Sequence, residues 1–505
     1  MDVVFAALVA AGFAYAVWRT RDYYFWVDDW LLIRQSGSVG GLVDHYNGHL
    51  SIVILGLYRV LIEVFGFEYA PFRLLGLLCL FSLPVAYYAT TRRRLGAPLA
   101  AVLALSLLAG ENVGFIAVEL NHYLALLGGI ACAALLDRGR RADGWLSLAL
   151  AFSLASAGGG IAVAAACVVH TVVTRGPVRR WGAVLAPMVL WGAWWLARGR
   201  DYGSGVGPSG ADAARIGRDV IVASFESLGL HVPILGLALM LAFLAYGASL
   251  LRRGLAHAAG WLAWTTALVV WVVGLAYSRS GLADPHAFRY QCMAIGFIVL
   301  AVVPRSPMAR PSWLPGAPDR PRRTAPAVVV LVLFAGVLAR GLGRESEAIS
   351  ELIVRSSTLN RGRVIVLGIE PEVVPDRTPL PFAMGLLRAG QVRTLLDRYG
   401  DPSFPGGDED LVRLGVPESS SFGVQERPDC PGLDAPFFPP LAREGLHLWA
   451  PDAAVEVDVR RFGTDWVRLA EIEPGEVVRI RLPGLESAIP WEVRADGACP
   501  VPAQG

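Results

Sequence analysis

The chain has 505 residues, of which 54% are hydrophobic and 17% charged, and its mean hydropathy is +0.48. This composition is too apolar for an ordinary soluble enzyme and predicts a polytopic α-helical membrane protein. All 45 basic residues are arginine, which excludes lysine Schiff-base chemistry and a Gly-Lys-Ser/Thr phosphate loop, and a net charge of +2 gives no reason to expect a nucleic-acid partner.

Apolar stretches that span a bilayer, or nearly so, recur along most of the chain. They predict about eleven transmembrane helices, over residues 2–18, 71–90, 97–110, 122–136, 145–157, 159–174, 181–197, 230–250, 258–277, 288–303 and 325–342. The first is expected to be an uncleaved span, because Asp2 stands where a signal peptide carries positive charge.

A further apolar stretch, residues 50–65, is expected to form a helix along the membrane surface in the first outer loop. With a cytoplasmic N-terminus, this arrangement places every arginine cluster on the cytoplasmic side, as the positive-inside rule requires. The clusters are 92–94, 138–141, 175–180, 252–253 and 305–323. We therefore expect a multi-pass protein of a bacterial cytoplasmic (inner) membrane, whose lipids are its surroundings.

The composition changes after residue 342, where Pro, Asp, Glu and Arg become frequent and short alternating stretches appear. We expect residues 1–342 to form a transmembrane catalytic domain and residues 343–505 to form a β-rich extracytoplasmic domain. Cys430 and Cys499 lie in this last part and are candidates for a disulfide bond if it faces an oxidising compartment.

The first outward-facing segment carries an acidic pair, Asp28 and Asp29, after an aromatic run. Carboxylates beside a bilayer are costly, so such a pair predicts a functional site. Adjacent residues on a helix point about 100° apart, so both carboxylates cannot face one substrate. The alternative is that Asp28 caps a short helix beginning at Asp29.

Two other outward-facing segments carry polar residues beside predicted spans. Glu119 and His122 are three residues apart, so on a helix they share a face that can hold an acceptor sugar or a metal. The alternative is a pair of interfacial polar residues at a helix start. His49, in a Gly-His step before residues 50–65, lies in the same first outer segment as the acidic pair.

Arg289 and Tyr290 stand at the expected outer edge of the tenth span. A guanidinium binds phosphate oxygens bidentately and stays charged, so this step predicts a site for a lipid phosphate. Arg279 and His286 are further candidates for the same role. The alternative is that these side chains extend toward lipid headgroups.

These features resemble the GT-C superfamily of lipid-dependent glycosyltransferases, which includes protein O-mannosyltransferases, aminoarabinose transferases, and actinobacterial arabinosyl- and mannosyltransferases. The resemblance rests on the acidic pair after the first span, the Gly-His step, Glu119 in the second outer loop and the extracytoplasmic C-terminal part. It implies that Asp28 or Asp29, with Asp28 favoured, is the catalytic base, that Glu119 is a second acid, and that Arg289 and Tyr290 bind the donor phosphate.

The chemistry expected of such a site is an inverting sugar transfer. Nucleotide sugars are absent outside the cytoplasm, so the donor must be carried by a lipid, typically polyprenyl phosphate. A phosphate leaving group is already anionic, so a single base acting on the acceptor hydroxyl suffices. The acceptor would be a cell-envelope glycan, a lipid or a protein. No cofactor is required, although a divalent metal bridging Asp28, Glu119 and phosphate is an alternative.

Two other functions fit a lipid-linked glycan. An O-antigen-type polysaccharide ligase or polymerase would depend on outer-loop arginines and histidines and not on an acidic pair. A non-enzymatic transporter would show internal repeats and charges near the middle of the membrane, neither of which the sequence shows.

Overall fold

The chain divides by its residue contacts into two compact units. The helical unit comprises Met1–Asp22, Gln35–Leu61 and Ala70–Leu352, and the second unit comprises Tyr23–Arg34, Ile62–Tyr69 and Ile353–Gly505. The computed structural model describes residues 1–21, 23–25, 27–46, 48–109, 116–200, 210–279, 288–304, 336, 389–399, 419–423, 446–450, 453–460, 467–480 and 492–501. The expected boundary at residue 342 lies outside these residues and stays a prediction.

The described part of the helical unit is built almost entirely from helices. They are α1 (Asp2–Arg19), α3 (Val39–Val43), α4 (Ile52–Phe65), α5 (Tyr69–Leu95), α6 (Ala97–Ser106), α7 (Ile116–Leu136), α8 (Asp143–Leu154), α9 (Gly159–Val173), α10 (Val178–Trp194), α11 (Gly210–Leu228), α12 (Pro233–Arg252), α13 (Leu255–Arg279) and α14 (Phe288–Ala301). The last residues of α4 and the first of α5 belong to the second unit.

Five of the described helices are long and apolar enough to cross a membrane. They are the stretches Asp2–Arg19, Tyr69–Leu95, Glu119–Leu136, Pro233–Arg252 and Leu255–Tyr277. Each predicted span up to residue 303 overlaps a helix, but several of these helices are too short to qualify, so the number of eleven is not confirmed. Residues 325–342, apart from Gly336, lie outside the described part of the chain.

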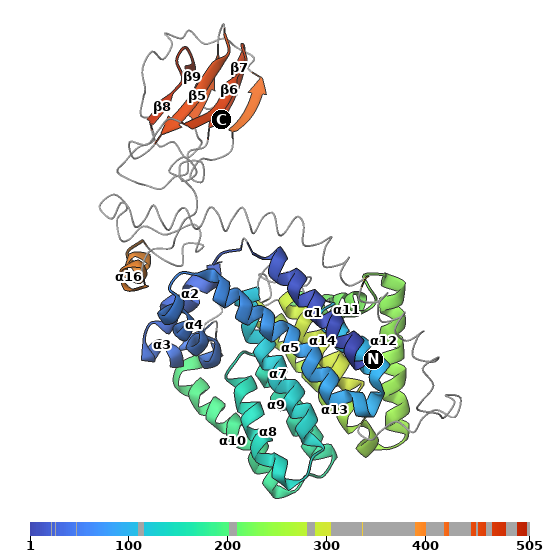
Figure 1. Cartoon of the computed structure of the whole chain (residues 1–505). Coiled ribbons are helices and arrows are strands. Elements are labelled where there is room, and N and C mark those ends of the chain that lie inside the picture. Colours follow the sequence, from blue (N-terminus) through green and yellow to red (C-terminus); the bar gives the residue numbers. More distant parts are fainter. Residues whose placement is uncertain are drawn as a thin grey trace. The chain divides into compact units, whose positions relative to one another are not determined.

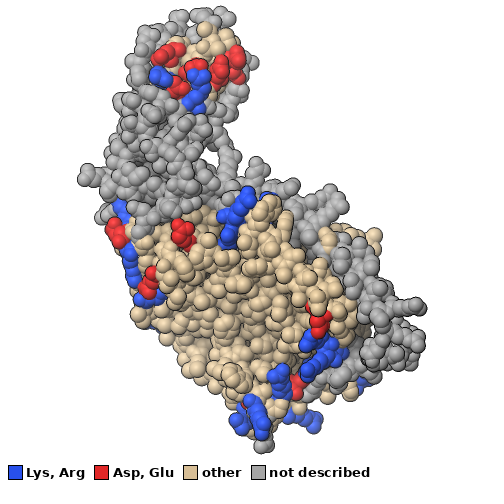
Figure 2. All heavy atoms as spheres, viewed as in Figure 1, with Lys and Arg blue, Asp and Glu red and all other residues tan. Residues whose placement is uncertain are grey.

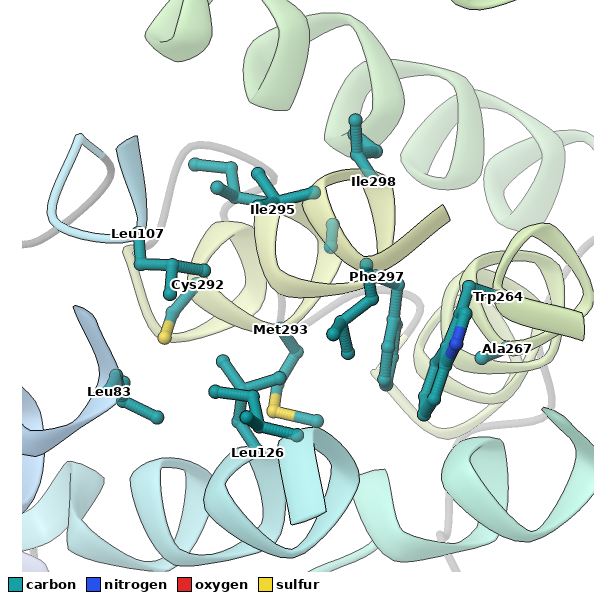
Figure 3. Close-up of a cluster of buried hydrophobic side chains, with 14 of the residues drawn as sticks. Leu83, Leu107, Leu126, Trp264, Ala267, Cys292, Met293, Ile295, Phe297 and Ile298 are labelled. Carbon is teal, nitrogen blue, oxygen red and sulfur yellow. The ribbon is translucent and has the colours of Figure 1, made fainter. Parts of the chain in front are cut away.

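Helix α14 lies in the core of the helical unit (Figure 1). Its side chains from Tyr290 to Ala301 are all buried, as expected of a helix that is apolar on every side. Phe297 stacks on Trp264 of α13 at a centroid distance of 6.2 Å, and Gly296 leaves space for the side chain of Leu126 on α7 (Figure 3). Close packing of this kind, with small residues at helix contacts, is the main source of association between membrane helices.

Charged side chains join several helix ends on one side of the helical unit. Asp137 follows α7 and lies 2.7 Å from Arg94 Nη1 of α5 and 3.3 Å from His170 Nε2 of α9. Arg92 Nη1 of α5 lies 2.7 Å from Asp2 Oδ2 at the start of α1. The C-terminal ends of α5, α7 and α9 therefore meet the N-terminal end of α1.

Arg180, in the first turn of α10, adds two more helix ends to this side. Its Nε lies 2.6 Å from Asp143 Oδ1 at the start of α8, and its Nη2 donates to the carbonyl of Arg138 at 2.6 Å. Its Nη1 donates to the carbonyl of Leu136, the last residue of α7. The guanidinium thus satisfies a buried carboxylate and carbonyls at a helix C-terminus.

The arginine clusters 92–94, 138–141 and 175–180 consequently gather at one end of the unit, which we call the arginine-rich end. Figure 2 shows an uncharged belt on the helical unit between its charged ends. This distribution suits a protein that crosses a bilayer. The compartment that the arginine-rich end faces stays a prediction.

Helix α11 is a feature that the sequence analysis does not predict. It lies in the expected outer segment 198–229, and it packs Ile216, Val220 and Phe225 inside the unit. Charged residues on its other face lower the average hydropathy, so a search for long apolar stretches passes over an amphipathic helix of this kind.

The second unit contains α2 (Val27–Ser36, of which the last two residues belong to the helical unit) and α16 (Ala389–Tyr399). Its strands are β3 (Ser419–Gly423), β4 (Leu446–Trp449), β5 (Val455–Arg460), β6 (Val467–Ile472), β7 (Glu476–Ile480), β8 (Glu492–Arg494) and β9 (Cys499–Val501). They form antiparallel sheets in the orders β3-β7-β4-β9 and β6-β5-β8. The expected β-rich character is therefore present in the described C-terminal residues.

The four-stranded sheet has a small core around Trp449, Val477 and Cys499. Cys499 is disulfide-bonded, whereas Cys79, Cys132, Cys167 and Cys292 are free. Cys430, the expected partner of Cys499, lies outside the described residues, so the pairing stays a prediction.

The buried pair of Arg180 and Asp143 predicts a large effect on stability. Arg180→Leu leaves the Asp143 carboxylate and two carbonyls without their donor, so we expect the free energy of unfolding to fall by about 3–5 kcal/mol. Arg179→Leu, an exposed arginine in the same turn, is the control and should change it by less than about 0.5 kcal/mol. Thermal and denaturant unfolding of the two purified variants tests this, and equal stabilities would contradict it.

The cluster at Asp137 predicts a pH dependence. Burial raises the pKa of Asp137, but the hydrogen bond and charge of His170 and the charge of Arg94 lower it more, so this pKa lies below its usual value. A lowered pKa stabilises the fold above the unfolded-state value, and this contribution is lost as the pH falls through the folded-state pKa.

We therefore expect Asp137→Asn to reduce the free energy of unfolding by roughly 1–2 kcal/mol at pH 7. The difference from the wild type should shrink below about pH 4. Unfolding curves at pH 7 and pH 3 measure it, with Asp219→Asn, whose partner Arg218 is exposed, as the control. A difference that does not depend on pH would rule out the ionised carboxylate as the cause.

Candidate functional site

The acidic pair lies in the first turn of α2, in the second unit. The helix begins at Val27, so Asp28 lies inside its first turn. The alternative prediction, that Asp28 caps a helix beginning at Asp29, is therefore wrong. Asp29 is fully buried, whereas Asp28 is partly exposed. Negative charge in a first turn is favoured by the helix dipole. Of the two residues, Asp28 is the more exposed.

Aromatic rings pack on both sides of the acidic pair. The rings of Phe25 and Tyr69 are 4.9 Å apart between centroids, and those of Trp30 and Phe67 are 5.4 Å apart. All four side chains are buried. Edge-to-face and tilted ring contacts of this kind are directional, so they hold the start of α2 in a defined orientation.

In the helical unit, the second predicted acid lies in the first turn of α7. Glu119 is buried, and Tyr123 Oη lies 3.5 Å from Glu119 Oε2, one turn further along the helix. His122 lies beside them, as the predicted spacing requires. Its ring meets the ring of Trp271 at a centroid distance of 5.9 Å and an interplanar angle of 78°.

Trp271, on α13, joins His122 to the start of α14. Its Nε1–H donates to the carbonyl of Tyr290 at 3.1 Å, and Tyr290 is buried. Trp271 is one of fifteen tryptophans in the chain and lies in an apolar stretch, so nothing in the sequence predicts this contact. The structure thus brings the predicted residues Glu119, His122 and Tyr290 to one region.

This region lies away from the arginine-rich end. Tyr87 Oη of α5 donates to the carbonyl of Val299 at 3.0 Å, which places the C-terminal part of α14 beside the part of α5 that leads to Arg92. Tyr290 begins the same helix at its other end. Glu119, His122 and Tyr290 therefore lie at the ends of their helices opposite the arginine-rich end.

His49 packs on a glycine at the start of α9. It lies in a two-stranded hairpin, β1 (His45–Tyr46) and β2 (His49–Leu50), in which Tyr46 is opposite His49. A Cβ atom on Gly158 would lie 2.6 Å from His49 Cε1, so only glycine leaves room for the imidazole ring. At the neighbouring Gly159, a Cβ atom would overlap Cε of Met293 on α14, so this position also has room only for glycine.

Other contacts attach residues 43–53 to the helices of the same unit. Trp194 Nε1 donates to the carbonyl of Val43 at 2.6 Å, and Arg198, in a π-helical turn after α10, lies 2.9 Å from Asp44 Oδ1. The backbone N–H of Val53 donates to the carbonyl of Ala155 at 3.2 Å, between α8 and α9. His49 is therefore fixed at the end of the unit that carries the predicted polar residues.

Several predicted residues have no described placement relative to one another. His286 and the side chains of Arg279 and Arg289 lie outside the described part of the structure. Asp28 and Asp29 belong to the second unit, whereas Glu119, His122, His49 and Tyr290 belong to the helical unit. A single pocket shared by these residues stays a prediction.

Metal binding was expected only as an alternative. Among the side chains that the structure describes, no group of three or more His, Cys, Asp and Glu residues is arranged to hold a metal ion. A metal between Asp28 and Glu119 would join residues of the two units, so this alternative also stays a prediction.

No family model and no curated protein matches the chain. Among solved structures, the crystal structure of ArnT from Cupriavidus metallidurans bound to undecaprenyl phosphate is similar to it, with a TM-score of 0.44 and 16% sequence identity. The similarity covers 83% of this chain and 92% of that chain.

The contact of His49 with Gly158 predicts that substitutions at these two positions have non-additive effects on the free energy of unfolding. Gly158→Ala should displace the imidazole and lower the free energy of unfolding by about 1–3 kcal/mol, as overpacking does. Gly144→Ala is the matched control, since a Cβ there meets nothing within 4 Å. In the double variant His49→Ala/Gly158→Ala the penalty should largely disappear, and additive effects of the two substitutions would contradict the contact.

Proposed function

We propose that this protein is an integral membrane glycosyltransferase of the GT-C type. It transfers a sugar from a polyprenyl-phosphate donor to an extracytoplasmic acceptor, a cell-envelope glycan, lipid or protein, with inversion. It acts in the cytoplasmic membrane of a bacterium, with the arginine-rich end inside and residues 343–505 outside, where a bond between Cys430 and Cys499 would stabilise the β-rich part.

The observation that carries this proposal is the unequal exposure of the acidic pair. Asp29 is fully buried and Asp28 is partly exposed, in a turn that lies outside the helices able to cross a membrane. A base must reach the proton of its substrate, whereas a positioning group need not. Asp28 is accordingly the base, and Asp29 orients the turn.

The reaction assigned to this site is a single displacement. The Asp28 carboxylate accepts the proton of the acceptor hydroxyl while the acceptor oxygen forms a bond to the anomeric carbon of the donor sugar. The bond between that carbon and the phosphate oxygen breaks, and its electron pair leaves with polyprenyl phosphate. Attack opposite the leaving group inverts the anomeric centre, and no acid or cofactor is needed.

The start of α14 supports a site for the donor phosphate. Arg289 and Tyr290 lie in its first turn, where the helix dipole favours an anion, and Trp271 fixes the carbonyl of Tyr290. Arg279 and His286 are further candidates, because they end α13 or precede α14 in the sequence. Glu119, His122 and His49 are assigned to the acceptor sugar.

The test is sugar transfer by the purified protein. It is incubated with a panel of polyprenyl-phosphate sugars, and release of free polyprenyl phosphate is measured. Asp28→Asn should lower kcat by about 10²–10⁴ with little change in the KM for the donor, because it removes the base and leaves binding intact. Asp29→Asn should lower kcat as well, by disturbing the turn.

Asp219→Asn is the matched control. Asp219 lies on α11 and its ion-pair partner Arg218 is exposed, so the loss of its charge should leave turnover near the wild-type value. Wild-type turnover in both Asp28→Asn and Asp29→Asn would overturn the assignment of the base. If those variants were active and Arg289→Ala were not, a ligase that needs no acidic pair would be the better explanation.

A further inference from the structure

Helix α16 contacts the segment Ile62–Tyr69 of its own unit, although the two are far apart in the sequence. The Tyr399 ring meets the Phe67 ring edge-on, with centroids 6.3 Å apart and an interplanar angle of 81°. Arg398 lies over the Tyr399 ring at 4.9 Å, and its Nη2 lies 3.4 Å from Glu63 Oε1. The ion pair is exposed and contributes little, so the ring contact is the more important of the two.

Gly66 shows that this contact constrains the backbone too. Its φ is +55°, in the left-handed region that favours glycine. A Cβ atom on Gly66 would lie 2.9 Å from the carbonyl oxygen of Tyr399. A side chain at this position would therefore strain the turn and push against the end of α16.

A series of packed rings leads from α16 to the acidic pair. Phe67, which contacts Tyr399, also packs against Trp30 and against Phe25, at centroid distances of 5.4 Å and 6.2 Å. Trp30 follows Asp29 directly, and Phe25 precedes Asp28 by three residues. Phe67 and its two partners are buried, so a displacement of Phe67 is transmitted to both sides of the first turn of α2.

We propose that α16 is a positioning element for the acidic pair. It holds Phe67, and Phe67 holds the start of α2, which sets the direction in which Asp28 points. The catalytic meaning of this inference rests on the proposed function. Tyr399 and Gly66 touch no reacting group in that scheme and act only through α2. The inference gives the C-terminal part of the chain a role in transfer, beyond any role in binding an acceptor.

The experiment uses the full-length protein and two disrupting variants, Gly66→Ala and Tyr399→Ala. Tyr399→Phe keeps the ring that packs on Phe67, so its amide exchange and its transfer rate should match those of the wild type. Asp397→Ala controls for a change on α16, because Asp397 is exposed. Gly56→Ala controls for the glycine change, because a Cβ there meets nothing within 4 Å.

Two measurements separate positioning from general damage. Hydrogen exchange of the amides in residues 27–36 should rise roughly tenfold in the two disrupting variants and stay at the wild-type rate in both controls and in Tyr399→Phe. Transfer should lose kcat in the same two variants with the KM for the donor nearly unchanged. If Gly66→Ala does not fold, the same two measurements are compared between Tyr399→Ala, which removes the ring, and Tyr399→Phe, which keeps it.

Equal exchange of residues 27–36 in Tyr399→Ala and Asp397→Ala would overturn the inference. Raised exchange with undiminished transfer would show that α16 holds α2 and that α2 is not catalytic. That result would overturn the proposed role of the aspartates and the catalytic part of this inference together. Exchange needs no substrate, so the packing between α16 and α2 is tested even if the panel of donors shows no turnover.

Discussion

The burial of charge beside an apolar interior is the constraint on which this structure depends. A carboxylate or guanidinium removed from water is stable only with a partner of opposite charge or with hydrogen bonds. At the arginine-rich end, Arg180 meets this requirement for Asp143 and for the carbonyls that end α7. The ion pairs of Arg92, Arg94 and Arg180 lie at helix ends, whereas the pair of Arg218 and Asp219 lies on the charged face of the amphipathic helix α11.

Much of the helical unit follows from this constraint and is therefore readable in the sequence. Runs of apolar residues predicted helices that overlap α1, α4 to α10 and α12 to α14, and three of the arginine clusters lie together at the arginine-rich end. The length of each helix is less predictable, because turns such as the one after α6 end a helix without changing the hydropathy of the stretch. Helix α11 was not predicted, because the charged residues on one face lower the mean hydropathy of a helix whose other face is apolar.

The candidate site was predictable as a set of residue types and not as a geometry. The acidic pair stands out because carboxylates beside a bilayer are costly, and Glu119 and His122 stand out by their spacing. The contacts that orient them come from residues without a chemical signature: Trp271 on α13, Gly158 at the start of α9, and Phe67 before α5. Contacts between distant segments depend on the fold, and a single sequence contains no record of which apolar residues meet.

The glycine run at residues 158–160 has a consequence for how the molecule is made. Gly158 receives the ring of His49 from the beginning of the chain, and Gly159 receives Met293 from a helix synthesised much later. During biosynthesis the hairpin that carries His49 leaves the ribosome well before Gly158 is synthesised. The imidazole ring cannot pack on Gly158 until that later segment has followed, and Met293 packs on Gly159 later still. The hairpin is therefore among the first parts of the chain to be translated, whereas its packing is completed late.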